Sequence, residues 1–475
     1  MRTLLRADAG PSTGVGHLSR CVALAEAAVA RSWRVFVVGS VSGADWLLAR
    51  LSELGVPVLP PASAGSSDGA ALAGQAVSLG ADVVLVDHYG LGELPEVRAV
   101  ARLVSMEDGR FGRRAADVVV DANLAQEHRS RDGSPLVLAG AAFAPLRRDV
   151  VNARTDHDAA ASRDEGPPGV VVVMGGGAAG EAVSAVLSAL RETQVPMSVR
   201  AISAVPVRVS AGPGQRFAVE PPTPTLPALL AEADLVVSAA GVTLLELCCI
   251  GTPAALVQLA DNQAAGYRAA VDRGLAAGLG TVAGLPAAAS RLRDLLTNPD
   301  ARAALSRAAS RTVDGRGAER ILDACEIGIR EATGADAERL LEWRNDPDTL
   351  AWSRGHHPVA EPVHRRWLAS SLQNPNRLLL VAETDHPNGT VRFDRIDDDT
   401  WEVSITVAPA DRGKGLAEKL LTLGEAALRA RHRPSTILAN IHEDNTRSLT
   451  LFRHAGYEDS NRQADGPFRW LAKRT

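Results

Sequence analysis

The chain has 475 residues, of which 46% are hydrophobic and 23% charged, and its formal net charge is −5. This length predicts two or three domains, and the composition is typical of a soluble globular protein. Because the charge is small and spread along the chain, we expect no broad basic face for nucleic acid. No apolar run is long enough to span a membrane, so we expect no membrane partner.

The cysteines and the N-terminus indicate the compartment. Cys21, Cys248, Cys249 and Cys325 show neither CxxC pairing nor metal-ligand spacing, so they predict buried thiols in a reducing compartment and no metal site. The N-terminus carries charges and lacks a long apolar core, which argues against a signal peptide. The sequence therefore predicts a cytoplasmic protein and leaves its oligomeric state open.

Residues 1–152 alternate short β-branched runs with segments rich in alanine and leucine. This alternation predicts βαβ units around a parallel sheet. The runs "RVFVVGS" (34–40), "ADVVLVDHYG" (81–90) and "AADVVVDANL" (115–124) are continuously apolar and end in turn residues. Such runs are typical of strands that are buried on both faces.

A polar segment that ends in a double proline, residues 153–168, predicts a linker. Residues 169–325 then repeat the α/β pattern, with a strand, a glycine loop and a helix in "GVVVVMGGGAAGEAVSAVLSAL". In residues 327–475 aromatic side chains become frequent, and "TVRFDRIDDDTWEVSITVAP" alternates around an acidic turn, which predicts an antiparallel hairpin. We therefore expect two α/β parts followed by an α+β domain.

A glycine loop with a histidine, Gly14-Val15-Gly16-His17, stands where the first strand leads into the first helix. Ligands of open α/β sheets bind beyond the carboxyl ends of the strands, against helix N-termini. Gly14 and Gly16 would let the backbone approach a phosphate, and His17 could take a proton from water. The alternative is a plain turn in which His17 caps the helix.

The second α/β part offers further candidates. Its glycine loop "MGGGAAG" (174–180) has the same two interpretations. Thr243 and Glu246 fit the capping box T-x-x-E, with Thr243 as N-cap. Alternatively, the two oxygens of Glu246 accept the hydroxyls of a ribose. Asn262 and Gln263 in "LADNQ" follow another predicted strand, where their amides could bind a sugar or a phosphate.

Residues 1 to about 325 resemble the UDP-2,4-diacetamido-2,4,6-trideoxy-β-L-altropyranose hydrolase family of pseudaminic acid biosynthesis, which is similar in fold to the lipid II-forming GT-B glycosyltransferase. The motifs that carry the resemblance are "RADAGPSTGVGHLSRC", "VDHYGL", "MEDGRFGR", "DANL", "PLRRDV", "MGGG", "SAAGVTLLE" and "DNQ". The resemblance implies two Rossmann-like halves of a GT-B fold, with His17 as the base that activates water and Glu246 at the UDP ribose. The other residues it implies for the UDP-linked sugar are Gly14, Gly16, Asp87, Tyr89, Gly175, Gly176, Gly241, Thr243, Asn262 and Gln263.

Residues 403–430 predict a strand, a tight loop and a helix, and the loop amides could form a nest for a pyrophosphate. The alternative is a plain turn with solvated charges. The loop resembles the R/Q-x-x-G-x-G/A signature of GNAT-type N-acetyltransferases, and "WRNDP" and "NIHEDNTRSLTLFRHAGY" strengthen this resemblance. It implies acetyl-CoA as co-substrate, held by Ile405, Val407, Arg412, Gly413, Lys414, Gly415, Leu416, Ala417 and Asn445. Phe452 stands where the family often has a tyrosine that acts as general acid.

Together the two resemblances imply a bifunctional nucleotide-sugar enzyme. The third domain is expected to acetylate the 4-amino group of a UDP-aminosugar, and the first two to release UDP and a free diacetamido sugar. Loop amides and helix dipoles can neutralise the diphosphate of the leaving group, so this chemistry needs no metal. The alternatives are a GT-B glycosyltransferase that uses a UDP-aminosugar donor, and a nucleotide-sugar-binding protein without catalytic activity.

Overall fold

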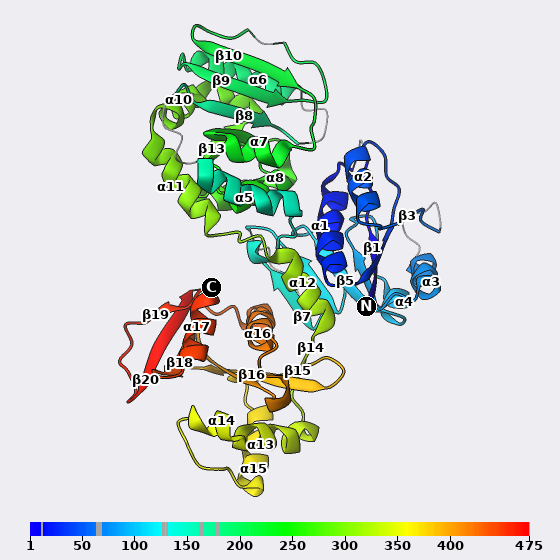
Figure 1. The fold of residues 1–475 in the computed structure, drawn as a ribbon, viewed down its shortest axis with the longest axis vertical. Coiled ribbons are helices and arrows are strands. Elements are labelled where there is room, and N and C mark those ends of the chain that lie inside the picture. The colour runs from blue at the N-terminus through cyan, green and yellow to red at the C-terminus, as the bar shows by residue number, and fades with distance from the viewer. Residues whose placement is uncertain are drawn as a thin grey trace. The chain divides into compact units, whose positions relative to one another are not determined.

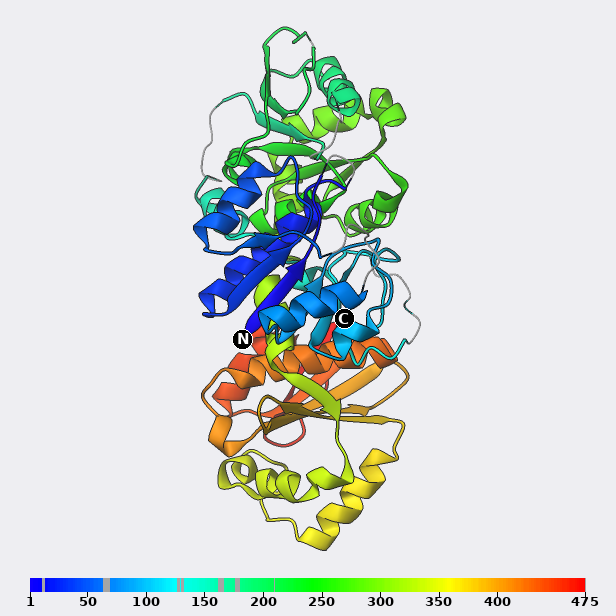
Figure 2. The same cartoon turned by 90° about the vertical axis from the view of Figure 1, so that its right-hand side faces the viewer.

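The structure is a computed structural model that describes residues 1–10, 13–62, 69–125, 129, 132–160, 166–175, 180–208 and 210–474, apart from the side chains at 155, 156, 158–160 and 262. The chain divides into two compact units, one with residues 1–132 and 139–322 and the other with residues 133–138 and 323–475. The first unit contains two α/β halves, and Figures 1 and 2 show the elements of each unit.

The first half is built on a sheet of strand order β3-β2-β1-β4-β5-β6-β7. Its strands are β1 (Arg2–Arg6), β2 (Arg34–Val38), β3 (Val58–Leu59), β4 (Val83–Val86), β5 (Arg102–Glu107), β6 (Val118–Asp121) and β7 (Leu136–Ala139). Its helices are α1 (Gly16–Ala30), α2 (Asp45–Glu53), α3 (Gly69–Leu79), α4 (Pro95–Arg98) and η1 (Ala141–Phe143). The pairs from β3 through β6 are parallel, and β4 is buried along its whole length, as its unbroken apolar run predicts.

The second half has a parallel sheet of order β10-β9-β8-β11-β12-β13. Its strands are β8 (Gly169–Val173), β9 (Met197–Ile202), β10 (Gln215–Glu220), β11 (Leu235–Ala239), β12 (Ala254–Gln258) and β13 (Ala277–Thr281). Its helices are α6 (Gly180–Glu192), α7 (Leu226–Glu232), α8 (Val242–Ile250), η2 (Asp261–Gln263), α9 (Ala264–Asp272), η3 (Val282–Ala288), α10 (Ala289–Thr297) and α11 (Pro299–Ser310). Helix α12 (Gly317–Glu326) follows and contacts the first half, where Arg31 donates to the carbonyl of Glu319. Alternate residues of β8 and β11 fill two apolar clusters, one on each face of the sheet.

Helix α5 (Arg148–Ala160) crosses the predicted boundary between the two halves. Its residues Val150 and Ala153 are buried in the core of the second half, together with Leu244 and Leu247 of α8. The first part of the predicted linker, residues 153–160, is therefore helical. Residues 161–165 of that linker lie outside the described part of the chain.

The second unit has a mixed sheet of order β14-β15-β16-β17-β18-β20-β19. Its strands are β14 (Gly328–Glu331), β15 (Arg377–Glu383), β16 (Pro387–Arg395), β17 (Thr400–Val407), β18 (Thr436–His442), β19 (Glu458–Asp459) and β20 (Phe468–Arg474). Its helices are η4 (Gly334–Asp336), α13 (Ala337–Asn345), α14 (Pro347–Ala351), α15 (Glu361–Leu372), η5 (Pro409–Asp411), α16 (Leu416–His432) and α17 (Thr446–His454). The predicted hairpin is confirmed as β16 and β17, and β17 with β18 is the parallel pair among the strands described.

The sheet of the second unit has helices on both faces, with α16 on one and α13 to α15 on the other (Figure 1). Gly424 lets α16 pack closely, because a Cβ at this position would come 2.3 Å from Cγ1 of Val391. Unlike the sheets of the first unit, this sheet is mainly antiparallel, as the alternating pattern predicts.

Candidate active sites

The carboxyl ends of the parallel strands in the first half bring polar side chains together. Arg6 ends β1, Asp87 follows β4 directly, Glu107 ends β5 and Asp121 ends β6. Because β4 lies between β1 and β5 in the sheet, these residues share one edge. This is the edge at which open α/β sheets bind their ligands.

His17 lies in the first turn of α1, which begins at Gly16. The preceding loop is tightened by two backbone hydrogen bonds between Gly10 and Gly14, of 2.8 and 3.2 Å, and Gly14 has a φ of 71°. Val15 is the N-cap, and no side chain caps the helix. The alternative in which His17 caps the helix is therefore wrong, and its ring is available for other contacts.

The ring of His17 is held by Asp87. Nδ1 of His17 is 2.6 Å from Oδ1 of Asp87, whose side chain is fully buried. Nε and Nη2 of Arg20 donate to the two oxygens of the same carboxylate at 2.7 and 2.8 Å. Burial by itself raises the pKa of Asp87, but the charge and hydrogen bonds of Arg20 and the hydrogen bond of His17 outweigh it and hold that pKa far below its usual value.

This arrangement fixes the tautomer of the neutral imidazole. An ionised carboxylate only accepts hydrogen bonds, so the contact with Asp87 at 2.6 Å places the proton of His17 on Nδ1. Nη2 of Arg20 also lies 3.0 Å from Nδ1, but it donates to the closer oxygen of Asp87 at 2.8 Å. Nε2 then carries the free lone pair, and it has no hydrogen-bond partner among the residues that the structure describes. A carboxylate that orients an imidazole in this way leaves the far nitrogen as a base.

Tyr89 forms the wall beside His17. The two rings meet edge to face, with centroids 4.4 Å apart. The hydroxyl of Tyr89 donates to Oδ2 of Asp108 at 2.6 Å, and Asn123 donates to Oδ1 of the same carboxylate at 2.7 Å. Burial, followed by the charge of Asp108, raises the pKa of Tyr89, so the phenol stays protonated.

Arg114 fixes the loop that carries Asp87 and Tyr89. Its side chain is buried, and its guanidinium donates to the backbone carbonyls of Val86, His88, Leu91 and Gly92. Sequence reasoning missed both Arg114 and Arg20. The position of Arg20 three residues after His17 on a helix was the available signal, since residues at that spacing share a face.

In the second half, α8 begins one residue before Thr243, with Gly241 as N-cap and no side-chain cap. The capping-box alternative for Thr243 and Glu246 is therefore wrong. Glu246 is buried, and burial raises the pKa of its carboxyl, which the charge of Arg147 opposes. Nη1 of Arg147 is 3.5 Å from Oε1 of Glu246, beyond a good hydrogen bond.

Gln263 lies beside the start of α8. Its Oε1 accepts from the backbone N–H of Leu259 at 3.0 Å, and a Cβ on Gly241 would come 3.9 Å from its Nε2. The structure thus brings together two of the predicted residues, Gly241 and Gln263. Gly175 has a φ of 91°, whereas Gly176 and the side chain of Asn262 lie outside what the structure describes.

The starts of α1 and α8 lie against each other. A Cβ on Gly16 would come 3.3 Å from Cγ2 of Val242. One turn further along, Arg147 joins the two helices, since its Nη1 donates to Oγ of Ser19 at 2.6 Å and also faces Glu246. The first-turn N–H groups of both helices therefore face a common region, where their dipoles favour an anion.

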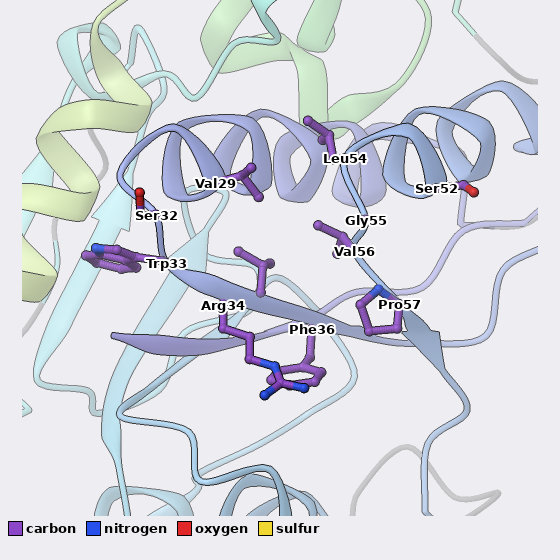
Figure 3. Close-up of a pocket in the computed structure, with 11 residues that line it drawn as sticks. Val29, Ser32, Trp33, Arg34, Phe36, Ser52, Leu54, Gly55, Val56 and Pro57 are labelled. Atoms are coloured by element: carbon purple, nitrogen blue, oxygen red, sulfur yellow. The ribbon is translucent and has the colours of Figure 1, made fainter.

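A separate cavity of about 640 Å³ lies at the other end of α1 (Figure 3). Its lining comes from the end of α1, the start of β2 and the segment after α2, and includes Trp33, Phe36 and Val56. It contains none of the predicted site residues, so we do not assign it to the site around His17.

In the second unit, β17 and β18 separate where the acetyl-CoA site is predicted. Their parallel register ends at Val403 and Ala439, so Ile405 and Val407 lie beyond the last pair. On its other side β17 stays paired with β16 as far as Val407. The backbone of Ile405 and Val407 therefore borders a gap between two strands, in which an extended ligand could add hydrogen bonds.

The predicted glycine loop leads into α16. Gly413 and Gly415 have φ values of 80° and 72°, and a Cβ on either would meet no atom within 4 Å. The loop thus leaves open space in front of the first turn of α16, which contains Leu416 and Ala417. Lys414 pairs with Asp411 at 2.8 Å.

Two further predicted residues of the second unit have structural partners. Nη2 of Arg412 donates to Oδ2 of Asp346 at 2.6 Å, which ties the loop to the start of α14. Asn445 is the N-cap of α17, and its Oδ1 accepts from Ser448 N–H at 3.1 Å. No described residue accepts a hydrogen bond from Nδ2 of Asn445, so a ligand could accept one.

Phe452, which occupies the position of the expected general-acid tyrosine, packs in the apolar core. Phe452 is buried, and its ring meets that of Tyr457 edge to face at 4.9 Å. The hydroxyl of Tyr457 donates to Oε1 of Glu425 at 2.9 Å, and burial raises the pKa of this phenol well above its usual value. Tyr457 is therefore committed to the core and does not replace the missing acid.

Residues 326–458 match the family model of an acetyltransferase (GNAT) domain. The chain has a C-terminal GNAT acetyltransferase domain. Among solved structures, the ribosomal-protein-alanine N-acetyltransferase of Brucella melitensis is similar to 31% of this chain over 99% of its own, with 27% identity and a TM-score of 0.27. The spermidine N-acetyltransferase of Vibrio cholerae is similar to 31% of this chain over 95% of its own, with 14% identity and a TM-score of 0.28.

MurG of Acinetobacter baumannii is similar to 68% of this chain over 98% of its own, with 16% identity and a TM-score of 0.50. This likeness shows the fold alone, and it confirms the predicted GT-B-like pair of Rossmann-like halves ahead of the GNAT domain. No curated protein matches this chain. In the described part of the chain, no group of three His, Cys, Asp or Glu side chains is placed to hold a metal ion, and no helix has the length and apolarity to cross a bilayer.

Proposed function

We propose that the first unit hydrolyses the C1–O bond of a UDP-linked diacetamido-trideoxyhexose, and that the GNAT domain acetylates the 4-amino group of its UDP-aminosugar precursor. These are two steps of nonulosonic acid biosynthesis of the pseudaminic acid type. One observation carries the hydrolase proposal. His17 is oriented by a buried carboxylate, and its Nε2 is free at the start of α1.

In this mechanism Nε2 of His17 takes a proton from a water at the anomeric carbon. The oxygen of that water forms the new bond to C1 as the C1–O bond to the diphosphate breaks. Attack from the face opposite the leaving group inverts the anomeric configuration. Asp87 holds the ring and stabilises the imidazolium that forms, so we assign it to positioning His17 and not to lining the sugar.

The leaving diphosphate is placed against the first turns of α1 and α8, whose N–H groups and dipoles neutralise its charge. Glu246 faces Arg147 at 3.5 Å without a hydrogen bond from it, so its oxygens are left to accept the hydroxyls of the ribose. Gln263 and Gly241, which lie together at the start of α8, border the same nucleotide.

Acetyl-CoA is assigned to the second unit and supplies the acetyl group as a thioester. The space in front of Gly413 and Gly415 fits a pyrophosphate, because no side chain fills it and the first turn of α16 points its N–H groups there. The backbone of Ile405 and Val407 would bind the pantetheine in the gap between β17 and β18.

The proposal is tested with a mass-resolved product assay on the full chain, with acetyl-CoA and the UDP-linked 4-aminosugar, for wild type and His17→Ala. We expect UDP and a free diacetamido sugar from wild type, and acetylation without UDP release from the variant. A free sugar formed by His17→Ala at the normal rate contradicts the hydrolase assignment.

The GT-B-like fold also suits a glycosyltransferase, so UDP release is measured without any acceptor. Release that depends on an added acceptor would favour glycosyl transfer. Tight UDP binding without turnover would favour a binding protein.

A further inference from the structure

The sheet of the second unit has a polar and aromatic face opposite α16. Ile405 shares the α16 face with Val391, its register partner. Because side chains alternate along a strand, Glu402 and Ser404 point to the opposite face. The parallel register with β18 and the antiparallel register with β20 extend that face. Its polar and aromatic members, called here the polar face, include Glu402, Ser404, Asn440, His442, Phe468 and Trp470.

Asn440 is the first polar residue of β18 beyond the point where β17 and β18 separate. Both polar atoms of its amide are shielded from solvent, and neither has a hydrogen-bond partner among the described residues. Native proteins rarely keep such a group, because it lowers the stability of the fold. A ligand that supplies both a donor and an acceptor would satisfy it.

Glu402 lies on β17 two residues before Ser404, the first residue beyond the pairing with β18. It is in register with Leu438. It accepts no hydrogen bond from the described residues, and its nearest cation is Nη2 of Arg354 at 3.7 Å. Burial raises the pKa of this carboxyl, an effect that the charge of Arg354 opposes and that of Asp394 reinforces. A carboxylate in this state is suited to accept a proton from an ammonium group.

Aromatic rings border the polar face. His442 meets Trp352 and Phe468 edge to face, with centroid distances of 5.6 and 5.2 Å. Nδ1 of His442 accepts from the backbone N–H of Asp444 at 3.2 Å, so Nε2 carries the proton of the neutral ring. The exposed ring of Trp352 offers a surface for the face of a sugar.

We propose that the polar face binds the acceptor of the acetyl transfer, an aminosugar that carries an acetamido group beside its amine. Asn440 would pair with both the C=O and the N–H of that acetamido group, and Glu402 would take a proton from the ammonium. This inference rests on the proposed function, and it assigns Asn440 and Glu402 to the recognition of the acceptor.

The transfer balances without a tyrosine acid. The ammonium gives one proton to Glu402, which later releases it to water. The neutral amine then forms the N–C bond to the acetyl carbonyl as the C–S bond breaks. The second proton of the nitrogen passes to the departing sulfur, which leaves as a thiol. The packing of Phe452 therefore does not prevent the reaction.

The test uses the full chain, acetyl-CoA and three acceptors, which are the UDP-linked 4-aminosugar with a 2-acetamido group, its 2-hydroxyl analogue, and a short peptide with a free N-terminus. Wild type should prefer the acetamido sugar by about 10²-fold or more in kcat/KM, since sites built to hydrogen-bond a group reject analogues that lack it. Asn440→Leu should lose this preference. Glu402→Gln should slow both sugars by about 10²-fold.

Thermal unfolding provides a readout apart from turnover. Asn440→Leu should unfold at no lower temperature than wild type, because it removes unpaired buried polar atoms. The control is Asn345→Leu, which should lower Tm because both amide atoms of Asn345 bond to the backbone of Val359. The acetamido sugar should raise the Tm of wild type more than that of Asn440→Leu.

The outcomes separate the two proposals. Preference for the peptide over both sugars overturns the proposed function and the substrate class inferred here. Acetylation of the sugars with unchanged preference in Asn440→Leu and an unchanged rate in Glu402→Gln overturns this inference alone. A lower Tm in Asn440→Leu, with equal loss for every acceptor, indicates a structural role and also overturns it.

Discussion

Replacing Asp87 with asparagine tests the base in the first unit most directly. The substitution keeps the size of the side chain but offers one acceptor where the carboxylate has two. In the structure His17 and Arg20 need both oxygens, at 2.6 to 2.8 Å. If the amide oxygen stays with Arg20, the amide NH2 faces Nδ1 of His17, and the proton of the ring moves to Nε2. The base is then lost.

Two magnitudes follow from this geometry. Losing an oriented general base should slow UDP release by about 10²- to 10⁴-fold. Arg20, with a side chain only 14% exposed, also loses its counter-ion. Breaking a buried ion pair costs about 3 to 5 kcal/mol of the free energy of unfolding. Because interactions lower the pKa of Asp87 in the folded state, its stabilisation is present at neutral pH and is lost as the pH falls through the acid range.

The assay is UDP release without acceptor, at a temperature at which circular dichroism shows the variant folded. Acetyl transfer by the GNAT domain of the same chain serves as the internal control, because Asp87 belongs to the other unit. The double variant His17→Ala, Asp87→Asn should be no slower than His17→Ala alone, since groups that act as one unit are not additive. A wild-type rate in Asp87→Asn, or additive losses in the double variant, would refute the reasoning.

Three more predictions follow from the described contacts. Glu246→Gln should leave Tm equal or higher, because burial of this charge outweighs its attraction to Arg147 at 3.5 Å, and should weaken UDP binding by about tenfold, measured by calorimetry. Gly415→Ala should raise the KM for acetyl-CoA well above that of the control variant Gly466→Ala. Both glycines have positive φ and open surroundings, but only Gly415 borders α16. Equal effects on KM would contradict the assignment of the pyrophosphate to this loop. Tyr457→Phe should lose about 1 kcal/mol of stability in urea unfolding and keep its rate of CoA release, whereas a large loss of rate would identify the phenol as the acid.

The sequence predicts the elements better than it predicts the partners of each side chain. The continuous apolar run of β4 indicates a strand buried on both faces, because it is short, rich in valine and bounded by turn residues. The pairing of His17 with Asp87 spans 70 positions, and it arises because β1 and β4 are neighbours in the sheet. No local pattern contains the order of the strands, so the sequence can place Arg20 beside His17 on one helix face but cannot show that both contact Asp87, nor where Arg114 lies.

The predicted capping box shows that a local motif can be present in the sequence and still not form in the structure. The T-x-x-E spacing of Thr243 and Glu246 is satisfied in the sequence, but α8 begins one residue too early for Thr243 to be its N-cap. The residue at which a helix begins depends on the backbone conformation of the preceding residue, which here is Gly241. The spacing of residue types does not show that conformation. For a related reason the polar composition of residues 153–160 does not reveal that they are helical or that the side chain of Ala153 is buried on α5.

Four carboxylates among the described residues form two pairs that differ in the direction of their pKa shift. The pKa values of Asp87 and Asp336 are lowered, that of Asp336 to about 2 chiefly by its hydrogen bond from Arg330. Those of Glu246 and Glu402 are raised by burial, and each has an arginine at 3.5 or 3.7 Å but accepts no hydrogen bond from the described residues. The first pair stabilises the fold and loses that effect as the pH falls. The second has the opposite sign, because the free protein gains stability as its carboxyls become protonated. Partners missing from the fold must then come from ligands, so UDP should raise Tm more at neutral than at acid pH in wild type, and this difference should disappear in Glu246→Gln.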